Sequence, residues 1–147
     1  YVHDEGAAML GGISGHAGLF SNSYEVAIVL QAMIQKGKYD NFKLFSQNSF
    51  DQFNFCYFCD KENRSGVGFD KPQIEGRHGS TFGGVSSESF GHYGYTGSMA
   101  WADPDKNIIF VFLSNRTYPT RENTLLQTSN TRTRSQEIVY KSLIDNK

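Results

Sequence analysis

The sequence predicts an α+β fold with helices on one face of an antiparallel sheet. Three observations lead to this prediction: helical periodicity in two segments of the first half, an apolar hairpin near residue 100, and a helical segment at the end. Helices and strands are segregated along the chain rather than alternating, which favours an antiparallel sheet. The 147 residues suit one domain that is large enough to bury a core.

The first helix is expected to begin near Ser21, where Ser and Asn side chains offer N-caps, and to end at Gly37. Residues 1–20 are rich in glycine without periodicity and are expected to form an ordered loop. One face of the predicted helix carries apolar residues at helical spacing: Val26, Ala27, Leu30, Met33 and Ile34.

Two further helices are expected. A short one starts at Ser46 and turns Phe50 and Phe53 inward, and a closing helix runs over residues 134–146. The side chains of the closing helix that are expected to face inward are Val139, Tyr140, Leu143 and Ile144.

The clearest feature is a β-hairpin, with strands at about 95–102 and 108–115 joined by a turn over 103–107. The second strand, IIFVFLSN, is apolar on both faces, so it is expected to be central in its sheet. Gly91, Gly94 and Gly97 open this region, and glycines in a strand require a reason, either a kinked hairpin or a backbone close to a substrate.

The remaining segments carry weaker signals. Residues 66–70 are expected to form a short strand, while residues 71–90 and 116–133 are polar or glycine-rich and are expected to be irregular.

Charge and composition exclude some classes of function. The formal charge is −1, from 14 basic and 15 acidic residues, so electrostatic binding to nucleic acid or to a membrane surface is not expected. No apolar run approaches the length of a membrane span. The chain starts without an initiator methionine or a signal peptide, so we expect a processed end or a cloning boundary, and the start predicts no compartment.

Cys56 and Cys59 form a C-x-x-C pair. Such a pair serves as a redox couple or as half of a metal site, but no second pair follows and no redox motif surrounds it. We therefore expect two free thiols in an aromatic-rich segment.

Other catalytic and binding motifs are absent from the sequence. None of the histidines (His3, His16, His78 and His92) forms an H-x-x-x-H or H-x-H pair, so no metal site is predicted. The glycine-rich stretch before the first helix lacks G-K-[ST] and is expected to be a tight loop rather than a phosphate cradle. None of the fifteen serines has a lysine three residues later, and Tyr39-Asp40-Asn41 reads as a turn.

Several stretches together give a resemblance to a known family. The stretch FGHYGYTG at 90–97 resembles the C-terminal part of the serine β-lactamase and penicillin-binding-protein superfamily, and the stretch from Val2 to Ser21 is similar to its class C-related branch. The tail fits the branch that is fused to bacterial glycoside hydrolases. The other residues that carry the resemblance are Trp101, Asp103, Pro104, Ser114, Asn115, Arg116, Pro119, Arg132, Arg134, Gln136 and Tyr140.

The resemblance implies that His92-Tyr93-Gly94 takes the place of the K-T-G motif on the strand beside the active site. Gly94 would leave room for a substrate along the strand, and the backbone N–H of Tyr95 would be an oxyanion donor. His92 would hydrogen-bond a substrate carboxylate or a catalytic tyrosine, with a charge that depends on pH. Tyr93 would contribute to substrate binding. The alternative for His92 is a satisfied polar residue at a sheet edge.

The resemblance also places His3, Asp4 and His16 in a loop at the rim of the site, where they would bind substrate. The alternative is that they satisfy the backbone groups of their own glycine-rich loop.

In the family, S-x-x-K and Y-x-N lie upstream of the segment matched here. The resemblance therefore implies that residues 1–147 are the C-terminal portion of one β-lactamase-related domain: loop and helices (1–90), active-site strand and hairpin (91–116) and closing helix (134–146). It implies a serine hydrolase that transfers an acyl group from an amide or ester, with this chain inert alone and no cofactor or metal. The expected partners are the missing N-terminal part, a glycoside hydrolase domain, and a second copy through an open sheet edge; the expected location is the bacterial periplasm.

Two alternative hypotheses stay open. In one, the fold survives as a non-catalytic scaffold or glycan-binding module, and loss of the upstream motifs would indicate it. In the other, the chain is an unrelated α+β binding domain with a glycine-kinked hairpin, which burial of residues 91–97 against a helix would indicate.

Overall fold

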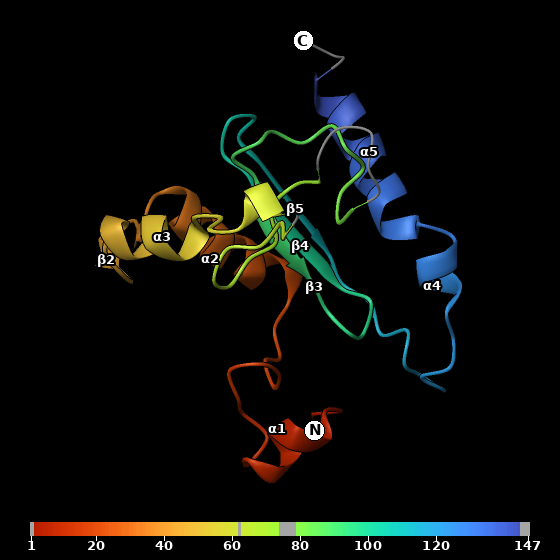
Figure 1. Ribbon diagram of the computed structural model, residues 1–147. Coiled ribbons are helices and arrows are strands. Elements are labelled where there is room, and N and C mark those ends of the chain that lie inside the picture. The colour runs from red at the N-terminus through yellow and green to blue at the C-terminus, as the bar shows by residue number, and fades with distance from the viewer. Residues whose placement is uncertain (1, 62, 74–78, 145–147) are drawn as a thin grey trace.

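The computed structural model describes residues 2–61, 63–73 and 79–144, and Figure 1 shows their arrangement. The helices are α1 (Glu5–Met9), α2 (Ser23–Ile34), α3 (Gln47–Asn54), the 3₁₀ turn at Cys59–Lys61, α4 (Leu125–Thr128) and α5 (Thr131–Ile144). The strands are β1 (Lys38–Tyr39), β2 (Phe42–Lys43), β3 (Phe90–Tyr93), β4 (Met99–Asp103) and β5 (Ile108–Phe112). The α+β class is confirmed. His78 and the predicted last residues of the closing helix, 145–146, lie outside the described residues.

The central sheet has three antiparallel strands in the order β3-β4-β5. The turn predicted before β5 is confirmed, but the strand predicted at 95–102 is placed wrongly, because residues 94–98 form the turn between β3 and β4. The prediction that β5 is central is also wrong for the described part of the chain, where β4 is central and β5 is an edge. An edge strand that is apolar on both faces calls for a separate explanation.

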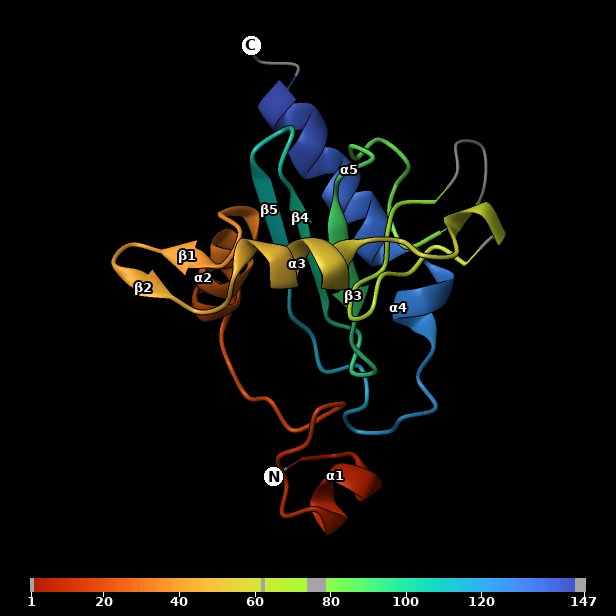
Figure 2. The same cartoon turned by 60° about the vertical axis from the view of Figure 1, so that its left-hand side comes forward.

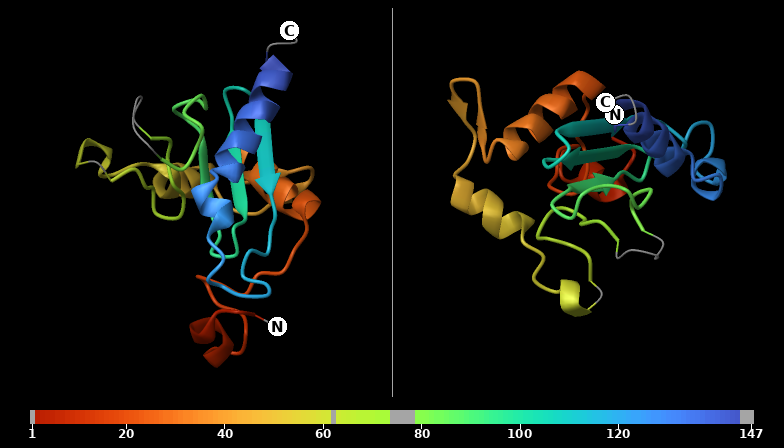
Figure 3. Two further views of the ribbon diagram at one scale, coloured as in Figure 1. Left: turned by 90° about the vertical axis from the view of Figure 1, so that its right-hand side faces the viewer. Right: turned by 90° about the horizontal axis from the view of Figure 1, so that it is seen from above.

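Helices cover both faces of the sheet, and the prediction that they share one face is wrong. α2 packs on the face that presents Phe90 and Ala102. α5 lies on the other face, where Tyr140 donates a hydrogen bond to Asp103. Figure 1 shows α2 and α5 on opposite sides of the strands, and the left view of Figure 3 shows α5 lying across the sheet.

Each face has its own apolar cluster, because side chains alternate along a strand. Leu30 and Phe50 pack with Phe90 and Ala102 on the α2 face. The cluster on the α5 face consists of Met99, Trp101 and Phe110. Gly91 lies opposite Trp101 in the ladder, and a Cβ at this position would collide with the Trp101 ring. Gly91 is therefore required for close packing within the hairpin.

The two predicted helices of the first half are confirmed, with their caps. Asn22 Oδ1 accepts a hydrogen bond from Glu25 N at 3.0 Å, and Gly37 follows α2 with a φ of +92°. Ser46 caps α3 through Ser49 N, and Phe50 is buried as predicted. The inward placement of Phe53 is wrong, since this side chain is 57% exposed.

Several short elements were not predicted. Residues 1–20 contain α1, which Asp4 caps by accepting from Ala7 N, instead of only a loop. The hairpin β1–β2 follows α2, and Tyr39-Asp40-Asn41 enters its turn, as expected of a turn (Figure 2). Residues 116–133 contain α4 and the start of α5. Residues 66–70 form no strand: Asp70 makes isolated bridges to Ser65 and to Gly91 of β3.

α5 is anchored by polar side chains more than by apolar ones. Tyr140 is buried as predicted, with Gln136 one turn earlier. The inward placement of three other residues is wrong, because their exposed fractions are 36% to 52%: Val139, Leu143 and Ile144. The helix thus turns an apolar strip to solvent in the described chain.

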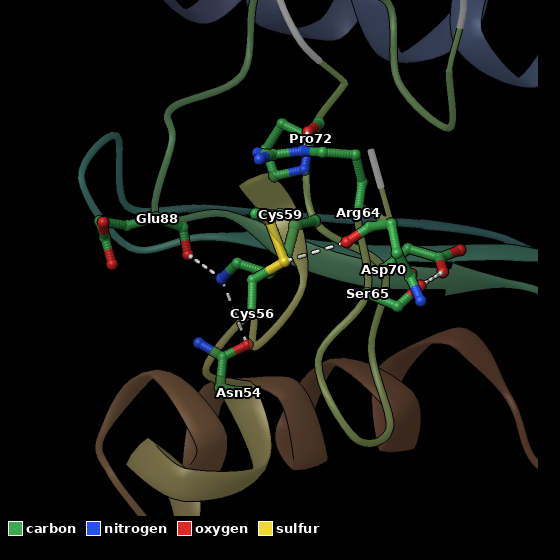
Figure 4. Close-up of a disulfide and its surroundings, with 10 residues drawn as sticks. Asn54, Cys56, Cys59, Arg64, Ser65, Asp70, Pro72 and Glu88 are labelled. Carbon is green, nitrogen blue, oxygen red and sulfur yellow. Dashed lines mark hydrogen bonds between the residues drawn. A yellow bond between two sulfur atoms is a disulfide. The ribbon is translucent and has the colours of Figure 1, made fainter. Parts of the chain in front are cut away.

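Cys56 and Cys59 form a disulfide, shown in Figure 4, so the prediction of two free thiols is wrong. The sequence motif allowed the pairing, but nothing in its spacing distinguished a disulfide from two thiols. No helix in the described part of the chain is long and apolar enough to cross a bilayer.

Candidate active site

The turn between β3 and β4 is closed by two backbone hydrogen bonds. Gly94 N donates to Ser98 O at 2.8 Å, and Gly97 N donates to Gly94 O at 2.9 Å. Gly97 has a φ of +94°, and a Cβ there would collide with Leu126 and Ser114, so glycine is required. The backbone N–H of Tyr95 finds no acceptor among the described residues. The Tyr95 N–H is therefore free to donate in the described chain, as is the N–H of Thr96.

Arg116, just beyond the end of β5, holds Tyr95 from one side. Its Nε donates to Tyr95 O at 2.9 Å, and its guanidinium carbon lies 4.7 Å from the centroid of the Tyr95 ring. Both contacts fix the peptide that follows the unused N–H. The same guanidinium also donates to the carbonyl oxygens of Arg121 and Asn123, which fixes its own position.

The N-terminal segment reaches the turn through His3, whose ring stacks near the Tyr95 ring with centroids 6.0 Å apart. Next to it, Asp4 Oδ1 lies 3.0 Å from His16 Nε2, and His16 Nδ1 lies 2.8 Å from Ser14 Oγ. The hydrogen bond from Ala7 N, and then the contact with His16, lower the pKa of the Asp4 carboxyl. Asp4 and His16 thus make contacts within their own loop. A role of His3, Asp4 and His16 in substrate binding stays a prediction.

His92 is exposed on the α2 face of β3, and its Nδ1 lies 2.8 Å from Tyr93 O. A carbonyl oxygen only accepts, so Nδ1 carries a hydrogen and donates. The neutral ring then has Nε2 as an acceptor, turned away from this bond. An imidazole in this state can take a proton from a neighbouring hydroxyl.

Tyr93 lies on the opposite face from His92 because successive side chains of a strand alternate. Its ring packs with the Trp101 cluster, and the guanidinium of Arg132 lies 3.9 Å from its centroid. Burial raises the pKa of the Tyr93 hydroxyl. A role for Tyr93 in substrate binding stays a prediction.

The structure brings His3 to Tyr95 and Asp4 to His16, whereas strand alternation separates His92 from Tyr93. The sequence analysis gave no role to Arg116, which is 21 residues from Tyr95 in the chain. Only the register of β4 and β5 reveals this contact. Residues 91–97 are not buried as a group: Gly91 and Gly97 are buried, and the others are exposed or half-buried.

The family model described as "Beta-lactamase" matches residues 2–131. The chain belongs to the beta-lactamase family. The match covers α1 to the start of α5, including the turn around Tyr95, and the fold agrees with a partial β-lactamase-like domain. The hypothesis of an unrelated binding domain is therefore wrong.

Curated relatives extend this result. The chain is similar to proteins named "Putative D-alanyl-D-alanine carboxypeptidase" from Salmonella enteritidis PT4, Salmonella agona and Salmonella gallinarum, each 37% identical over 119 residues. These alignments cover 78% of this chain and 26% of each relative, so the chain spans about a quarter of the length of these relatives. No solved structure matches. Together, the family match and the relatives support a serine hydrolase type of relationship.

Proposed function

We propose that this chain supplies the oxyanion-binding edge of a serine hydrolase of the β-lactamase type. The observation that carries the proposal is the Tyr95 N–H, which has no acceptor among the described residues and lies in a turn held by Arg116. An N–H that is fixed in place before the reaction costs little reorganisation when negative charge develops. Gly94 is exposed, and a Cβ there would meet only Ser98, so the approach to this N–H is open.

The proposed reaction is acyl transfer from an amide or ester. A serine outside this chain loses its proton to a base and attacks the carbonyl carbon. The C=O electron pair moves to the oxygen, and the oxyanion accepts from Tyr95 N–H, a contact worth about 3 kcal/mol in the transition state. When the oxyanion collapses, the C–N or C–O bond breaks, the amine or alcohol leaves with a proton, and the acyl group stays on the serine. His92 Nε2 is available to accept a proton or, when the ring is charged, to bind a substrate carboxylate. No step requires a metal or an organic cofactor.

We also propose that the chain is the C-terminal portion of a larger domain and is inert alone. Three features support this: the relatives are about three times as long, β5 is an edge of the described sheet although apolar on both faces, and large apolar side chains are exposed. Those in the N-terminal part are Met9, Leu10, Ile13, Leu19, Phe20 and Tyr24. An upstream segment that carries S-x-x-K and Y-x-N would cover these side chains and add strands to the sheet.

The substrate class and location remain part of the proposal. The names of the Salmonella proteins favour a substrate that ends in D-alanyl-D-alanine. The Cys56–Cys59 disulfide favours an oxidising compartment, in line with the periplasm. A glycoside hydrolase domain in the same longer protein rests on the resemblance of the tail alone.

The rival is a non-catalytic scaffold or glycan-binding module, or a homodimer that pairs through β5. β5 is apolar and has no partner strand on its outer side among the described residues, which favours a further segment or chain that covers this edge.

Labelling with a fluorescent penicillin and a fluorophosphonate tests the proposal, on this chain and on the protein extended upstream. We expect only the extended protein to become labelled. If neither protein becomes labelled, the scaffold is favoured. If the isolated 147-residue chain becomes labelled, its proposed lack of a nucleophile is contradicted. A sequence of the upstream segment without S-x-x-K would also contradict the hydrolase.

A further inference from the structure

A pocket with a volume of about 300 Å³ lies beside the Cys56–Cys59 disulfide, and no residue of the Tyr95 turn lines it. Its wall combines residues after α3 with the segment that precedes β3. The residues that matter here are Asn54, Arg64, Lys71 and Glu88, several of which Figure 4 shows around the disulfide. We call this cavity the Lys71 pocket.

Lys71 is a buried lysine, with only 8% of its surface exposed. Its Nζ donates to Asn54 Oδ1 at 3.3 Å and to Glu88 O at 3.4 Å, the two dashed contacts beside these residues in Figure 4. Both acceptors are uncharged and both contacts are long. In the described part of the chain, no carboxylate lies within ion-pairing distance of this ammonium.

A buried ammonium without a close counter-charge destabilises the fold, because the charge has lost its hydration. Burial lowers the pKa of Lys71, while the more distant carboxylate of Glu88 acts in the opposite direction. The other lysine of the wall is already paired, since Lys36 Nζ lies 2.8 Å from Asp51 Oδ1. Of the two lysines in the wall, Lys71 is therefore the one without a carboxylate partner among the described residues, and its Nζ lies 5.8 Å from the centroid of the Phe90 ring.

Arg64 adds a second cation to the same wall. Its Nε donates to Pro72 O at 2.7 Å, which fixes the plane of the guanidinium close to Lys71 in the chain fold. A guanidinium fork and an ammonium on one cavity wall form a common arrangement for binding oxyanions in proteins.

We propose that the Lys71 pocket binds a small oxyanion, a carboxylate or a phosphate, between Lys71 and Arg64. The bound anion supplies the counter-charge that Lys71 lacks among the described residues, and the Lys36–Asp51 pair closes the wall without competing for it. The site shares no residue with the turn around Tyr95, so it stands or falls independently of the proposed hydrolase.

Calorimetric titration of the chain with inorganic phosphate, and separately with acetate, tests this proposal and distinguishes the two sources. We expect saturable binding of at least one anion, with sodium chloride at equal ionic strength giving none. Lys71→Met keeps the length of the side chain and removes the charge, and should weaken binding at least about tenfold. Lys38→Met removes the same charge from an exposed strand and should bind as the wild type does.

Arg64→Gln provides a second variant if Lys71→Met does not fold, as judged by circular dichroism, and should also weaken binding. The proposal is overturned if the wild-type chain shows no saturable binding of either anion. It is equally overturned if the folded Lys71→Met or Arg64→Gln chain binds with unchanged affinity.

Discussion

Arg116, just beyond the end of β5, fixes Tyr95 by a 2.9 Å hydrogen bond to its carbonyl oxygen and by a guanidinium that lies 4.7 Å from its ring centroid. The two residues meet because β4 and β5 return the chain to the end of β3. The contact holds the residue whose backbone N–H has no acceptor in the described chain. Its consequences are measurable in the chain itself.

Arg116→Met should loosen the turn without unfolding the sheet. On this partly exposed side chain the variant loses one hydrogen bond and one cation–π contact to Tyr95, together worth about 1 kcal/mol, and also the two hydrogen bonds to the carbonyl oxygens of Arg121 and Asn123. Hydrogen exchange should therefore accelerate at residues 94–97 while β4 stays protected. Arg121→Met is the matched control, because the side chain of Arg121 is exposed and only its carbonyl takes part in the contact. Equal exchange in both variants would contradict the role of Arg116.

Gly91→Ala should destabilise the chain far more than Gly94→Ala. A Cβ at Gly91 would collide with the Trp101 ring and Ala100 O, an overpacking that costs about 1–3 kcal/mol. A Cβ at Gly94 would meet only Ser98, at 3.4 Å. Urea denaturation followed by Trp101 fluorescence compares the two. Similar midpoints would show that the backbone of β3 relaxes around the added methyl group.

Tyr140→Phe should lower the free energy of unfolding at neutral pH. It should also make that free energy fall less steeply as the pH rises into the alkaline range. Burial, and then the Asp103 carboxylate, raise the pKa of the Tyr140 hydroxyl. The unfolded tyrosine ionises first, so the contribution of Tyr140 is complete below pH about 10 and is lost as the pH rises above it. The neutral-pH cost is about 1 kcal/mol for the lost hydrogen bond to Asp103. Thermal unfolding between pH 7 and 11 measures both effects, and parallel curves for wild type and variant would contradict the argument.

The pKa of the Asp4 carboxyl should lie below its ordinary value of 3.8, because Ala7 N and His16 favour the charged form. A lowered pKa means that its contribution to loop order is present above the unfolded value and is lost as the pH falls through the folded one. Carbon-detected NMR of the Asp4 carboxyl measures this midpoint. In His16→Phe the midpoint should move up, and no movement would show that Ala7 N acts alone.

The sequence predicted the elements with strong local signals and missed those that depend on partners. Asn22 and Ser46 cap their helices through hydrogen bonds to backbone groups three residues away, and Gly37 ends a helix through its own backbone conformation. Such local signals can be recognised in the sequence alone. α1 and the β1–β2 hairpin are too short for periodicity. The exposure of Phe53 and Leu143 depends on which segments pack against their helices, and the helical periodicity of a sequence gives no information about those segments.

Only part of the candidate site could be predicted from the sequence, because only some of its residues are neighbours in the chain. His92, Gly94 and Tyr95 are adjacent in the sequence, so a motif identifies them together. Arg116 and His3 reach Tyr95 from far along the chain, and the Lys71 pocket joins residues 54, 64, 71 and 88. Such groups form only when the strands take their register.

The rate of fluorophosphonate labelling of the upstream-extended protein, compared between Tyr95→Pro and Tyr95→Phe, tests the central claim most directly. Proline removes the backbone N–H of residue 95, whereas phenylalanine keeps it and removes only the hydroxyl. With both variants folded by Trp101 fluorescence, the account predicts a loss of about 10²–10³ in rate for the proline variant and a near-normal rate for phenylalanine. Labelling of the proline variant at the wild-type rate would show that Tyr95 N–H is not the oxyanion donor.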